Sequence, residues 1–201
     1  MIRLGITGGI GSGKSSVSAL LAKRGIDVYD CDSKARAIMQ TDAARSALTD
    51  ATGIDFYIDG QLDKRRMADY LFSSERNARI VDDIVHPLVR QDFAEWCRRN
   101  EQNGSRICAM ESAILFEAGM KDAVDAVVVV DAPERLRLER VMKRDSVASY
   151  KVEERIRMQM PQEQKVQLAD YVICNDGDEI NLERETDALL DRILNDIRTI
   201  N

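Results

Sequence analysis

A glycine-rich segment near the start of the chain has the composition of a phosphate-binding loop. Residues 8–15 read Gly-Gly-Ile-Gly-Ser-Gly-Lys-Ser and match the pattern G-x-x-x-x-G-K-[ST] at every fixed position. Glycines let the backbone N–H groups of such a loop turn toward phosphate oxygens, and the following helix adds the positive end of its dipole. We expect Lys14 to reach the β- and γ-phosphates of a nucleotide and the Ser15 hydroxyl to bind Mg²⁺. A turn that binds nothing is disfavoured, because a strand pattern precedes the segment and a helix pattern follows it.

Carboxylates follow three of the predicted strands, at the edge where open α/β sheets bind ligands. Asp30 and Asp32 follow the second strand pattern, Glu111 follows the third and Asp131 follows the fourth. Phosphoryl transfer to a hydroxyl needs a base that accepts the hydroxyl proton. Position alone leaves open which acid takes this role, and each of them could instead be a helix N-cap or a surface turn residue.

Two arginines and the single histidine are further candidates. Arg140 and Arg144 are four residues apart and therefore share a helix face. Against a triphosphate, this pair would spread the charge of the transition state. It could also be a solvated face that pairs with Glu139 or Asp145. His86 lies at the edge of an apolar run, which favours packing, capping or substrate contact over catalysis.

The elements that must position these residues alternate along much of the chain. Short apolar runs at residues 2–7, 26–29, 106–110, 126–130 and 171–174 predict five buried parallel strands. Helical patterns cover residues 14–23, 133–144 and 178–200, the last with apolar residues at helical spacing from Ile180 onward. This alternation predicts an α/β fold in which a five-stranded parallel sheet is flanked by helices.

Two stretches depart from the alternation. Residues 33–103 are mostly helical in pattern and contain no convincing buried strand, so we interpret them as a helical insertion. Residues 146–165 are charged and helical, and they could be a mobile lid or a solvated helix. The sequence has no internal repeat and no Gly/Ser/Pro linker. We therefore expect one compact protein with a core (1–32 and 104–201), an insertion (33–103) and a small lid (145–166) within the core.

Composition excludes several classes of protein. The 201 residues are 44% hydrophobic and 32% charged, which is typical of a globular chain. A net charge of −6 argues against a nucleic-acid partner, and no apolar run is long enough to cross a membrane. The four cysteines are scattered and no signal-peptide pattern is present. We expect a cytoplasmic protein that is a monomer or a small homo-oligomer.

The phosphate loop alone leaves several classes of nucleotide-binding protein open. A GTPase would normally carry an N-K-x-D element, but residues 175–178 read Asn-Asp-Gly-Asp and lack the lysine. Motor and transporter ATPases usually need a larger core and a partner surface. Small-molecule kinases remain, and their insertions bind the acceptor and close over it to exclude water.

Motifs along nearly the whole chain resemble those of the dephospho-CoA kinase family. The string T-G-G-I-G-S-G-K-S at residues 7–15 is more specific than the general loop pattern, and residues 30–32, Asp-Cys-Asp, are similar to the family's D-A-D. Residues 114–117 resemble P-L-L-F-E with Ala113 in place of proline, residues 140–145 resemble R-x-x-x-R-D, and residues 169–175 match A-D-x-V-I-x-N. Further similarities lie at Gly60-Gln61-Leu62, Phe72, His86-Pro87 and Gln159, which falls in the family's lid helix.

The resemblance implies a P-loop kinase that phosphorylates the ribose 3′-hydroxyl of dephospho-CoA with ATP and Mg²⁺, the final step of coenzyme A synthesis. It implies Asp32 as the base, with Lys14 and Arg140 as the other catalytic residues. The implied ATP-binding residues are Gly11, Ser12, Gly13, Lys14, Ser15, Ser16, Arg140, Arg144, Asn175 and Gly177. The implied substrate-binding residues are Asp32, Arg65, His86 and Glu117, and Ser15 is the implied Mg²⁺ ligand. Another small-molecule kinase of the same fold and a nucleotide-dependent switch remain as alternatives.

Overall fold

The computed structural model describes residues 1–200, with side chains as far as Asn195, and divides them into two compact units. Unit 1 contains residues 1–29 and the described residues from Asn100 onward, and unit 2 contains Asp30–Arg99. The sequence placed the boundaries of the core after residue 32 and before residue 104. Asp32 therefore lies in unit 2 rather than in the core segment to which the sequence assigned it.

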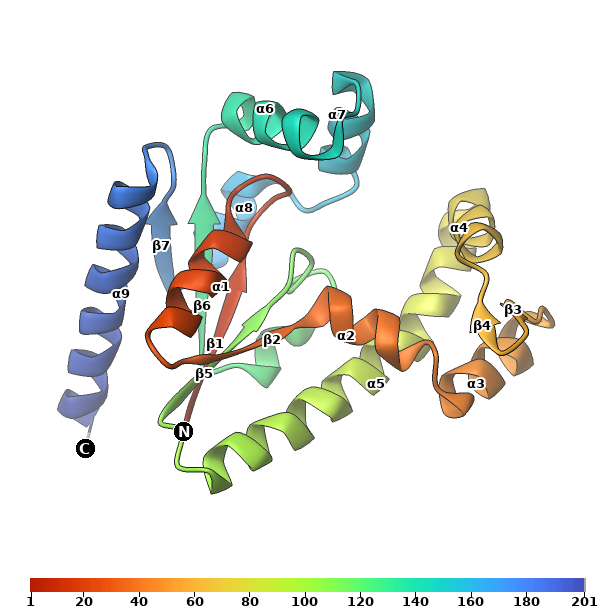
Figure 1. Cartoon of the computed structure of the whole chain (residues 1–201), viewed down its shortest axis with the longest axis horizontal. Helices are drawn as coiled ribbons and strands as arrows, with labels where there is room; N and C mark the ends of the chain where they lie inside the picture. Colours follow the sequence, from red (N-terminus) through yellow and green to blue (C-terminus); the bar gives the residue numbers. More distant parts are fainter. Residues whose placement is uncertain (201) are drawn as a thin grey trace. The chain divides into compact units, whose positions relative to one another are not determined.

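Unit 1 is built on a five-stranded parallel sheet with strand order β2-β5-β1-β6-β7 (Figure 1). Its strands are β1 (Ile2–Thr7), β2 (Asp27–Asp30), β5 (Ile107–Glu111), β6 (Ala126–Asp131) and β7 (Tyr171–Cys174). All five lie within one residue of the ranges that the sequence predicts. β1 is the central strand, with Leu4 opposite Ala109 of β5 and Ala126 of β6. The loop that follows β1 therefore emerges from the middle of the sheet.

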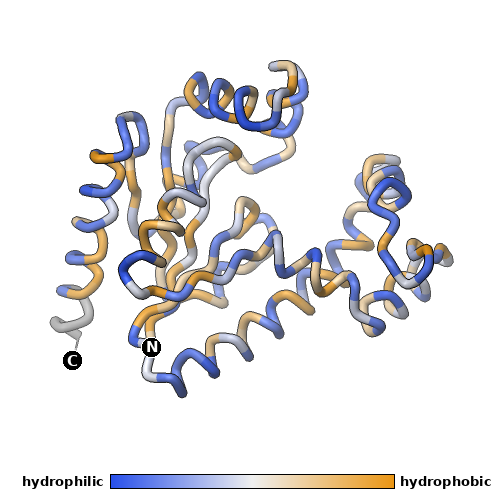
Figure 2. The backbone as a smooth tube through the Cα atoms, in the orientation of Figure 1, coloured by the Kyte–Doolittle hydropathy of each residue, from blue (hydrophilic) through white to orange (hydrophobic). Residues whose placement is uncertain are grey.

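Helices cover both faces of this sheet. They are α1 (Lys14–Lys23), α6 (Glu134–Asp145), α7 (Ser149–Arg157), α8 (Gln162–Leu168) and α9 (Glu179–Ile200), with a 3₁₀ turn at Met120–Ala123. On one face, Val17 and Leu21 of α1 and Leu189 and Ile193 of α9 pack against the strands, while α8 packs against β6 on the other (Figure 1). The inner strands β5 and β6 are predominantly hydrophobic, as expected when both faces are covered, whereas the edge strand β2 begins and ends with aspartate (Figure 2). The sequence predicts that Ile180 belongs to the apolar side of α9. This prediction is wrong, because Ile180 is 70% exposed.

The lid stretch contains two helices, α7 and α8, which a short turn and Pro161 separate. Pro161 precedes α8 as its N-cap, a position that suits a residue without a backbone N–H. Gln159 lies in the turn after α7, so its expected place in a lid helix is wrong. In this turn, Gln159 contacts the phosphate loop at residues 8–15.

Unit 2 contains the helices α2 (Cys31–Ile38), α3 (Asp42–Thr52), α4 (Lys64–Ser73) and most of α5 (Glu75–Gln102). Leu48, Phe56, Met67 and Phe93 are buried in it. Unit 2 also has a small antiparallel hairpin, β3 (Tyr57–Ile58) and β4 (Gln61–Leu62), which the sequence reading missed. Its two-residue turn is Asp-Gly with φ values of 49° and 76°, the conformation that tight hairpins favour.

Candidate active site

The phosphate loop, residues 8–15, connects the carboxyl end of β1 to α1. Gly11 and Gly13 have φ values of 79° and 100°, which side chains rarely adopt. Neither position has room for a side chain. A Cβ on Gly11 would lie 2.4 Å from the Arg137 carbonyl oxygen, and one on Gly13 would lie 2.0 Å from Nδ2 of Asn175. The glycines are therefore required both by the backbone conformation and by the neighbouring groups.

The loop presents a set of open hydrogen-bond donors. Among the described residues, the N–H groups of Gly11, Gly13 and Ser15 have no hydrogen-bond acceptor, whereas the Ser12 N–H donates to the Gly9 carbonyl at 3.1 Å. The Ser12 hydroxyl is buried and has no hydrogen-bond partner within the described part of the chain. Donors that converge at a helix N-terminus form an anion-binding site, so this loop can bind phosphate oxygens.

Lys14 is the first residue of α1, and its side chain extends back across the loop. Its Nζ donates to the carbonyl oxygens of Gly8 at 3.0 Å and Gly9 at 3.2 Å. The ammonium group is thus held within the loop, where a phosphate could replace a carbonyl as its acceptor. The Ser15 and Ser16 side chains are exposed beside it.

Arg140 and Asn175 form a connected pair next to the loop. Asn175 is buried, and its Nδ2 donates to the Ser12 carbonyl at 2.7 Å. Arg140 Nη2 donates to the Asn175 carbonyl at 3.1 Å and to its Oδ1 at 3.4 Å. Nη1 of Arg140 is buried without an acceptor in the part of the chain that the structure describes. Because an unpaired buried donor is unfavourable, this nitrogen is suited to an anionic oxygen brought by a ligand.

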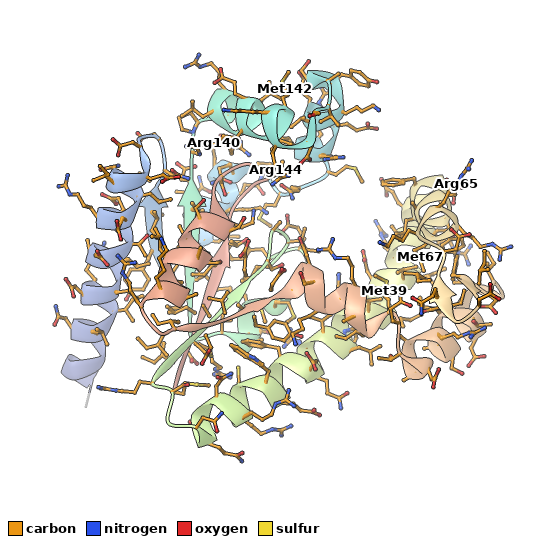
Figure 3. All side chains as sticks on the ribbon, in the orientation of Figure 1. Met39, Arg65, Met67, Arg140, Met142 and Arg144 are labelled. Atoms are coloured by element: carbon orange, nitrogen blue, oxygen red, sulfur yellow. The ribbon has the colours of Figure 1, made fainter. Side chains whose placement is uncertain are left out.

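Arg144 has a different environment from Arg140, although both lie on the same side of α6, with Met142 on the other (Figure 3). Its Nε donates to Asp145 at 2.7 Å, and Arg155 of α7 donates to the other carboxylate oxygen at 2.9 Å. The hydrogen bonds from Arg144, and then those from Arg155, hold the pKa of the Asp145 carboxyl below its ordinary value. Glu139 pairs instead with Arg135, at 3.3 Å. In this structure Asp145 connects α6 to α7, and Arg144 pairs with Asp145 within α6.

Glu117 contacts the segment that leads into α8. Its Oε1 lies 2.9 Å from Nζ of Lys165 and accepts the Met160 N–H at 2.8 Å. The Lys165 side chain is completely buried, while a quarter of the Glu117 side chain is exposed. Gly177 lies further along the chain, in the loop between β7 and α9.

Comparison with known proteins identifies the family of this chain. Residues 2–181 match the family described as "CoaE: Dephospho-CoA kinase". The chain belongs to the dephospho-CoA kinase family. A dephospho-CoA kinase from Bacteroides fragilis is 43% identical over 178 residues, which cover 88% of this chain and 86% of the relative. One from Corynebacterium glutamicum is 34% identical over 196 residues, covering 96% and 98% of the two chains.

Solved structures show the same architecture. The crystal structure of TT1252 from Thermus thermophilus has a TM-score of 0.82 and 34% identity, and the match covers 95% of this chain and 97% of that one. A dephospho-CoA kinase from Campylobacter jejuni has a TM-score of 0.71 and 21% identity, covering 95% and 96%. A shikimate kinase from Acinetobacter baumannii, with a TM-score of 0.54 and 16% identity over 98% and 94% of the chains, shares the fold. The fold is that of P-loop kinases, and membership of the family implies use of ATP.

Three of the predicted site residues, Asp32, Arg65 and His86, lie in unit 2. Asp32 is exposed in the first turn of α2, and its carboxylate makes no hydrogen bond or ion pair with the described residues. The preceding Asp30 is the N-cap of α2 and accepts the N–H groups of Asp32 and Ser33. His86 Nε2 lies 3.6 Å from Asp82, and Arg65 Nε lies 4.0 Å from Asp69. The N-cap alternative therefore applies to Asp30 and leaves Asp32 available.

Two side chains beside the phosphate loop, Gln162 and Arg137, were missed from the sequence, and Gln159 was recognised there without its contact to the loop. Gln162 and Gln159 accept the N–H groups of Gly9 and Ile10, at 2.7 and 2.9 Å. Arg137 is buried, and its Nη1 lies 2.3 Å from where a Cβ on Gly9 would be. No local pattern indicates the contacts of the two glutamines, because they lie about 150 residues beyond the loop in the sequence. Arg137 could have been suspected from its place one turn before Arg140.

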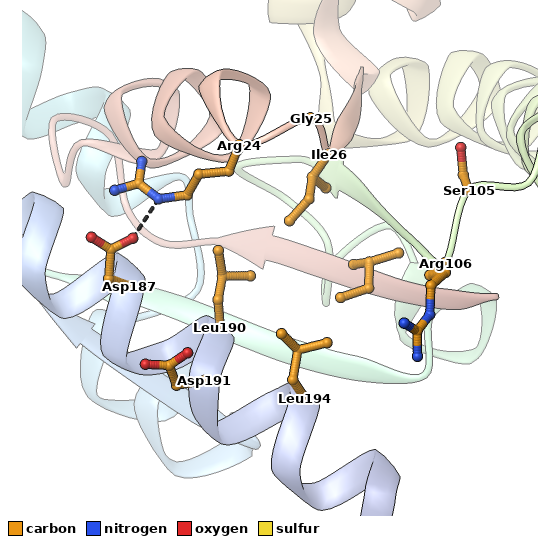
Figure 4. Close-up of a pocket in the computed structure, with 10 residues that line it drawn as sticks. Arg24, Gly25, Ile26, Ser105, Arg106, Asp187, Leu190, Asp191 and Leu194 are labelled. Atoms are coloured by element: carbon orange, nitrogen blue, oxygen red, sulfur yellow. Dashed lines mark hydrogen bonds and ion pairs between the residues drawn. The ribbon is translucent and has the colours of Figure 1, made fainter.

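A cleft of unit 1 lies away from the phosphate loop. The cleft has a volume of about 520 Å³ and is bounded by the turn after α1, the start of β5 and α9 (Figure 4). Ile26, Ile107 and Leu190 supply apolar side chains, and Arg24 at its rim pairs with Asp187 and Glu183. Since β5 begins here, the cleft lies at the amino ends of the strands, opposite to the ligand-binding edge. Within the described part of this chain, no helix could span a membrane.

Proposed function

We propose that the protein transfers the γ-phosphoryl group of ATP to the ribose 3′-hydroxyl of dephospho-CoA, with Asp32 as the base. The observation that carries the proposal is the phosphate loop itself, in a chain of the dephospho-CoA kinase family. Its open N–H groups lie next to a buried Arg140 nitrogen that has no acceptor among the described residues. The β- and γ-phosphates of ATP supply acceptors for both.

Each group has a defined part in the transfer. The loop N–H groups and Lys14 hold the phosphates, and Arg140 stabilises the charge that develops on the transferred group. Asp32 accepts the proton of the 3′-hydroxyl as that oxygen bonds to the γ-phosphorus. The bond from the γ-phosphorus to the bridging oxygen breaks, and ADP leaves with that oxygen. The catalytic residues are Asp32, Lys14 and Arg140.

Mg²⁺ fits the residues present beside the loop. The Ser15 side chain is exposed and makes no hydrogen bond with the described residues, so its hydroxyl can be a ligand. The described residues contain no cluster of three His, Cys, Asp or Glu side chains that would hold a metal alone. Mg²⁺ of kinases is bound largely by phosphate oxygens and water, and it neutralises phosphate charge when bound. Ser15 is the residue that would hold it here.

The acceptor is assigned to Arg65 and His86 of unit 2 and to Glu117 of unit 1. The side chain of Arg65 is 93% exposed and only loosely paired, which suits a residue that binds a charged substrate. One carboxylate oxygen of Glu117 makes both of its contacts, so the other is available. Residues 33–103 and 145–166 are the proposed acceptor-binding insertion and lid, in a protein that we place in the cytoplasm.

The test is Mg²⁺-dependent release of ADP from ATP by the purified protein, with and without dephospho-CoA. We expect strong stimulation by dephospho-CoA and CoA as the product, identified by mass. Omitting Mg²⁺ should remove the stimulation. ATP binding without stimulation would retain the phosphate site and overturn the acceptor, and a screen of nucleosides and other small alcohols would then follow.

A further inference from the structure

Two consecutive N–H groups at the start of the phosphate loop are bound from outside the loop. The Gly9 N–H donates to Oε1 of Gln162 at 2.7 Å, and the Ile10 N–H donates to Oε1 of Gln159 at 2.9 Å. Both glutamines belong to the turn after α7 and the start of α8. These are different N–H groups from the open ones of Gly11, Gly13 and Ser15.

The amide of Gln162 can take only one orientation. Its Nε2 donates to the Val130 carbonyl at 3.1 Å and to Oδ1 of Asp131 at 2.9 Å, and the residue is only 6% exposed. Exchanging the amide oxygen and nitrogen would place a donor against the Gly9 N–H and an oxygen against two acceptors. Every amide atom is therefore used, and the position of Oε1 is fixed by the carboxyl end of β6.

This contact matters most when a nucleotide is present. In the structure, the Lys14 ammonium also holds this part of the loop through the carbonyls of Gly8 and Gly9. A phosphate that draws Lys14 away weakens those bonds, whereas the Gln162 contact lies outside the phosphate site and persists. The second half of the loop has its own support, because Asn175 holds the Ser12 carbonyl.

We infer that Gln162 is a positioning residue for the phosphate loop. By fixing the Gly9 peptide, it keeps the open N–H groups further along the loop directed at the phosphates, and Gln159 assists through Ile10. The inference rests on the proposed ATP site. It assigns to the start of α8 a function in nucleotide binding that is separate from any closure of the lid.

A purely structural role for Gln162, as an anchor of α8, makes a different prediction. Lys165 already anchors α8 through the Ala113 carbonyl, at 2.6 Å, and through Glu117. Loss of Gln162 should therefore leave α8 in place and affect the loop. The distinguishing quantities are the affinity for ATP, the KM for dephospho-CoA and the exchange rate of the Gly9 amide hydrogen.

The experiment compares Gln162→Leu with Gln164→Leu, an exposed glutamine of the same helix. ATP binding is measured by calorimetry in the presence of Mg²⁺ and without acceptor. We expect Gln162→Leu to weaken ATP binding about tenfold, because the Gly9 N–H is left unpaired in a buried site. The KM for dephospho-CoA should change less than twofold, the Gly9 amide should exchange faster by NMR, and Gln164→Leu should match the wild type.

Unchanged ATP affinity in a folded Gln162→Leu protein would overturn the inference, as would equal losses for both substrates. If that variant does not fold, Gln159→Leu removes the acceptor of the Ile10 N–H from a half-buried position. We expect it to weaken ATP binding by a smaller factor, and no effect would count against the inference. Failure of the wild type to bind ATP would instead overturn the proposed function.

Discussion

Gly13 is the glycine of the phosphate loop with the least space for a side chain. Its φ is 100°, and a Cβ would lie 2.0 Å from Nδ2 of Asn175, the group that holds Ser12. We expect Gly13→Ala to weaken ATP binding more than tenfold, because Asn175 must move away from both Ser12 and Arg140. Gly25→Ala is the matched control, since Gly25 has a φ of 77° but no neighbouring atom within 4 Å. Calorimetry should show normal ATP binding for Gly25→Ala, and equal losses in both variants would point to backbone strain alone.

Asp32 is the residue on which the proposed chemical step depends. We expect Asp32→Asn to lower kcat by about 100-fold or more, because an amide cannot accept the hydroxyl proton. ATP binding, measured by calorimetry, should be unchanged. Asp42→Asn is the control, as Asp42 is also an exposed acid in the first turn of a helix of unit 2. An Asp32→Asn enzyme with nearly wild-type kcat would remove Asp32 from the role of base.

Sequence reasoning identifies residues whose function follows from their immediate neighbours. Lys14 and Ser15 are of this kind, because the loop pattern fixes their positions relative to the glycines. Gln162 is not, since its partner Gly9 is 153 residues away and its side chain type carries no chemistry of its own. Asn175 falls between the two cases. Its motif was recognised, but its hydrogen bonds to Ser12 and Arg140 depend on how β7 and α6 meet the loop.

At the scale of elements, the position of α8 depends on a buried lysine. The Lys165 side chain is completely buried and pairs with Glu117, which is a quarter exposed. We expect Glu117→Ala to lower the free energy of unfolding by about 3 kcal/mol, because it leaves the Lys165 ammonium buried without its counter-charge. Lys165→Met should cost less, since it removes the buried charge and keeps most of the side-chain volume. Urea denaturation measures both, and a larger loss for Lys165→Met would contradict this account.

The junction of α6 and α7 should respond to acid. Arg144 and Arg155 hold the pKa of Asp145 below its ordinary value, so their contribution to stability is present above about pH 4 and is lost as the pH falls through the lowered pKa. We expect Asp145→Asn to have a lower melting temperature than the wild type between pH 5 and pH 8. The difference should shrink below about pH 4. Glu154→Gln is the control, since Glu154 is an exposed acid of α7 that forms no ion pair with the described residues. A difference that grows in acid would contradict the assignment.

The elements themselves were largely predictable because buried parallel strands are short continuous apolar runs. Val127 to Val130 are almost completely buried, and β1 and β5 have similar buried runs, whereas the edge strands β2 and β7 are partly exposed. The order of the strands was not predictable, since it depends on pairing between distant segments such as β1 and β5. The hairpin of unit 2 was not predicted, because each of its strands has only two residues, too few to show an alternating pattern.

At the scale of the whole molecule, the residues that would bind ATP belong to unit 1, which is formed from two separate parts of the chain. The protein carries a net charge of −6, so it does not attract a polyphosphate over long distances. In the proposed site, binding would depend instead on local charge, the ammonium of Lys14 and the guanidinium of Arg140, together with the open N–H groups of the loop. A ligand that binds only the folded chain should therefore stabilise it by an amount set by its own affinity.

We expect ATP with Mg²⁺, at 100 times its dissociation constant, to raise the free energy of unfolding by about 2.7 kcal/mol. Lys14→Ala should lose most of this gain at the same ATP concentration, because the ammonium that meets the phosphates is gone. Lys23→Ala, which removes an exposed lysine from the last turn of the same helix, should keep it. Urea denaturation followed by circular dichroism, with and without ATP, measures the gain. Full stabilisation of Lys14→Ala would mean that ATP binds elsewhere on the molecule, and the phosphate loop would lose its assigned role.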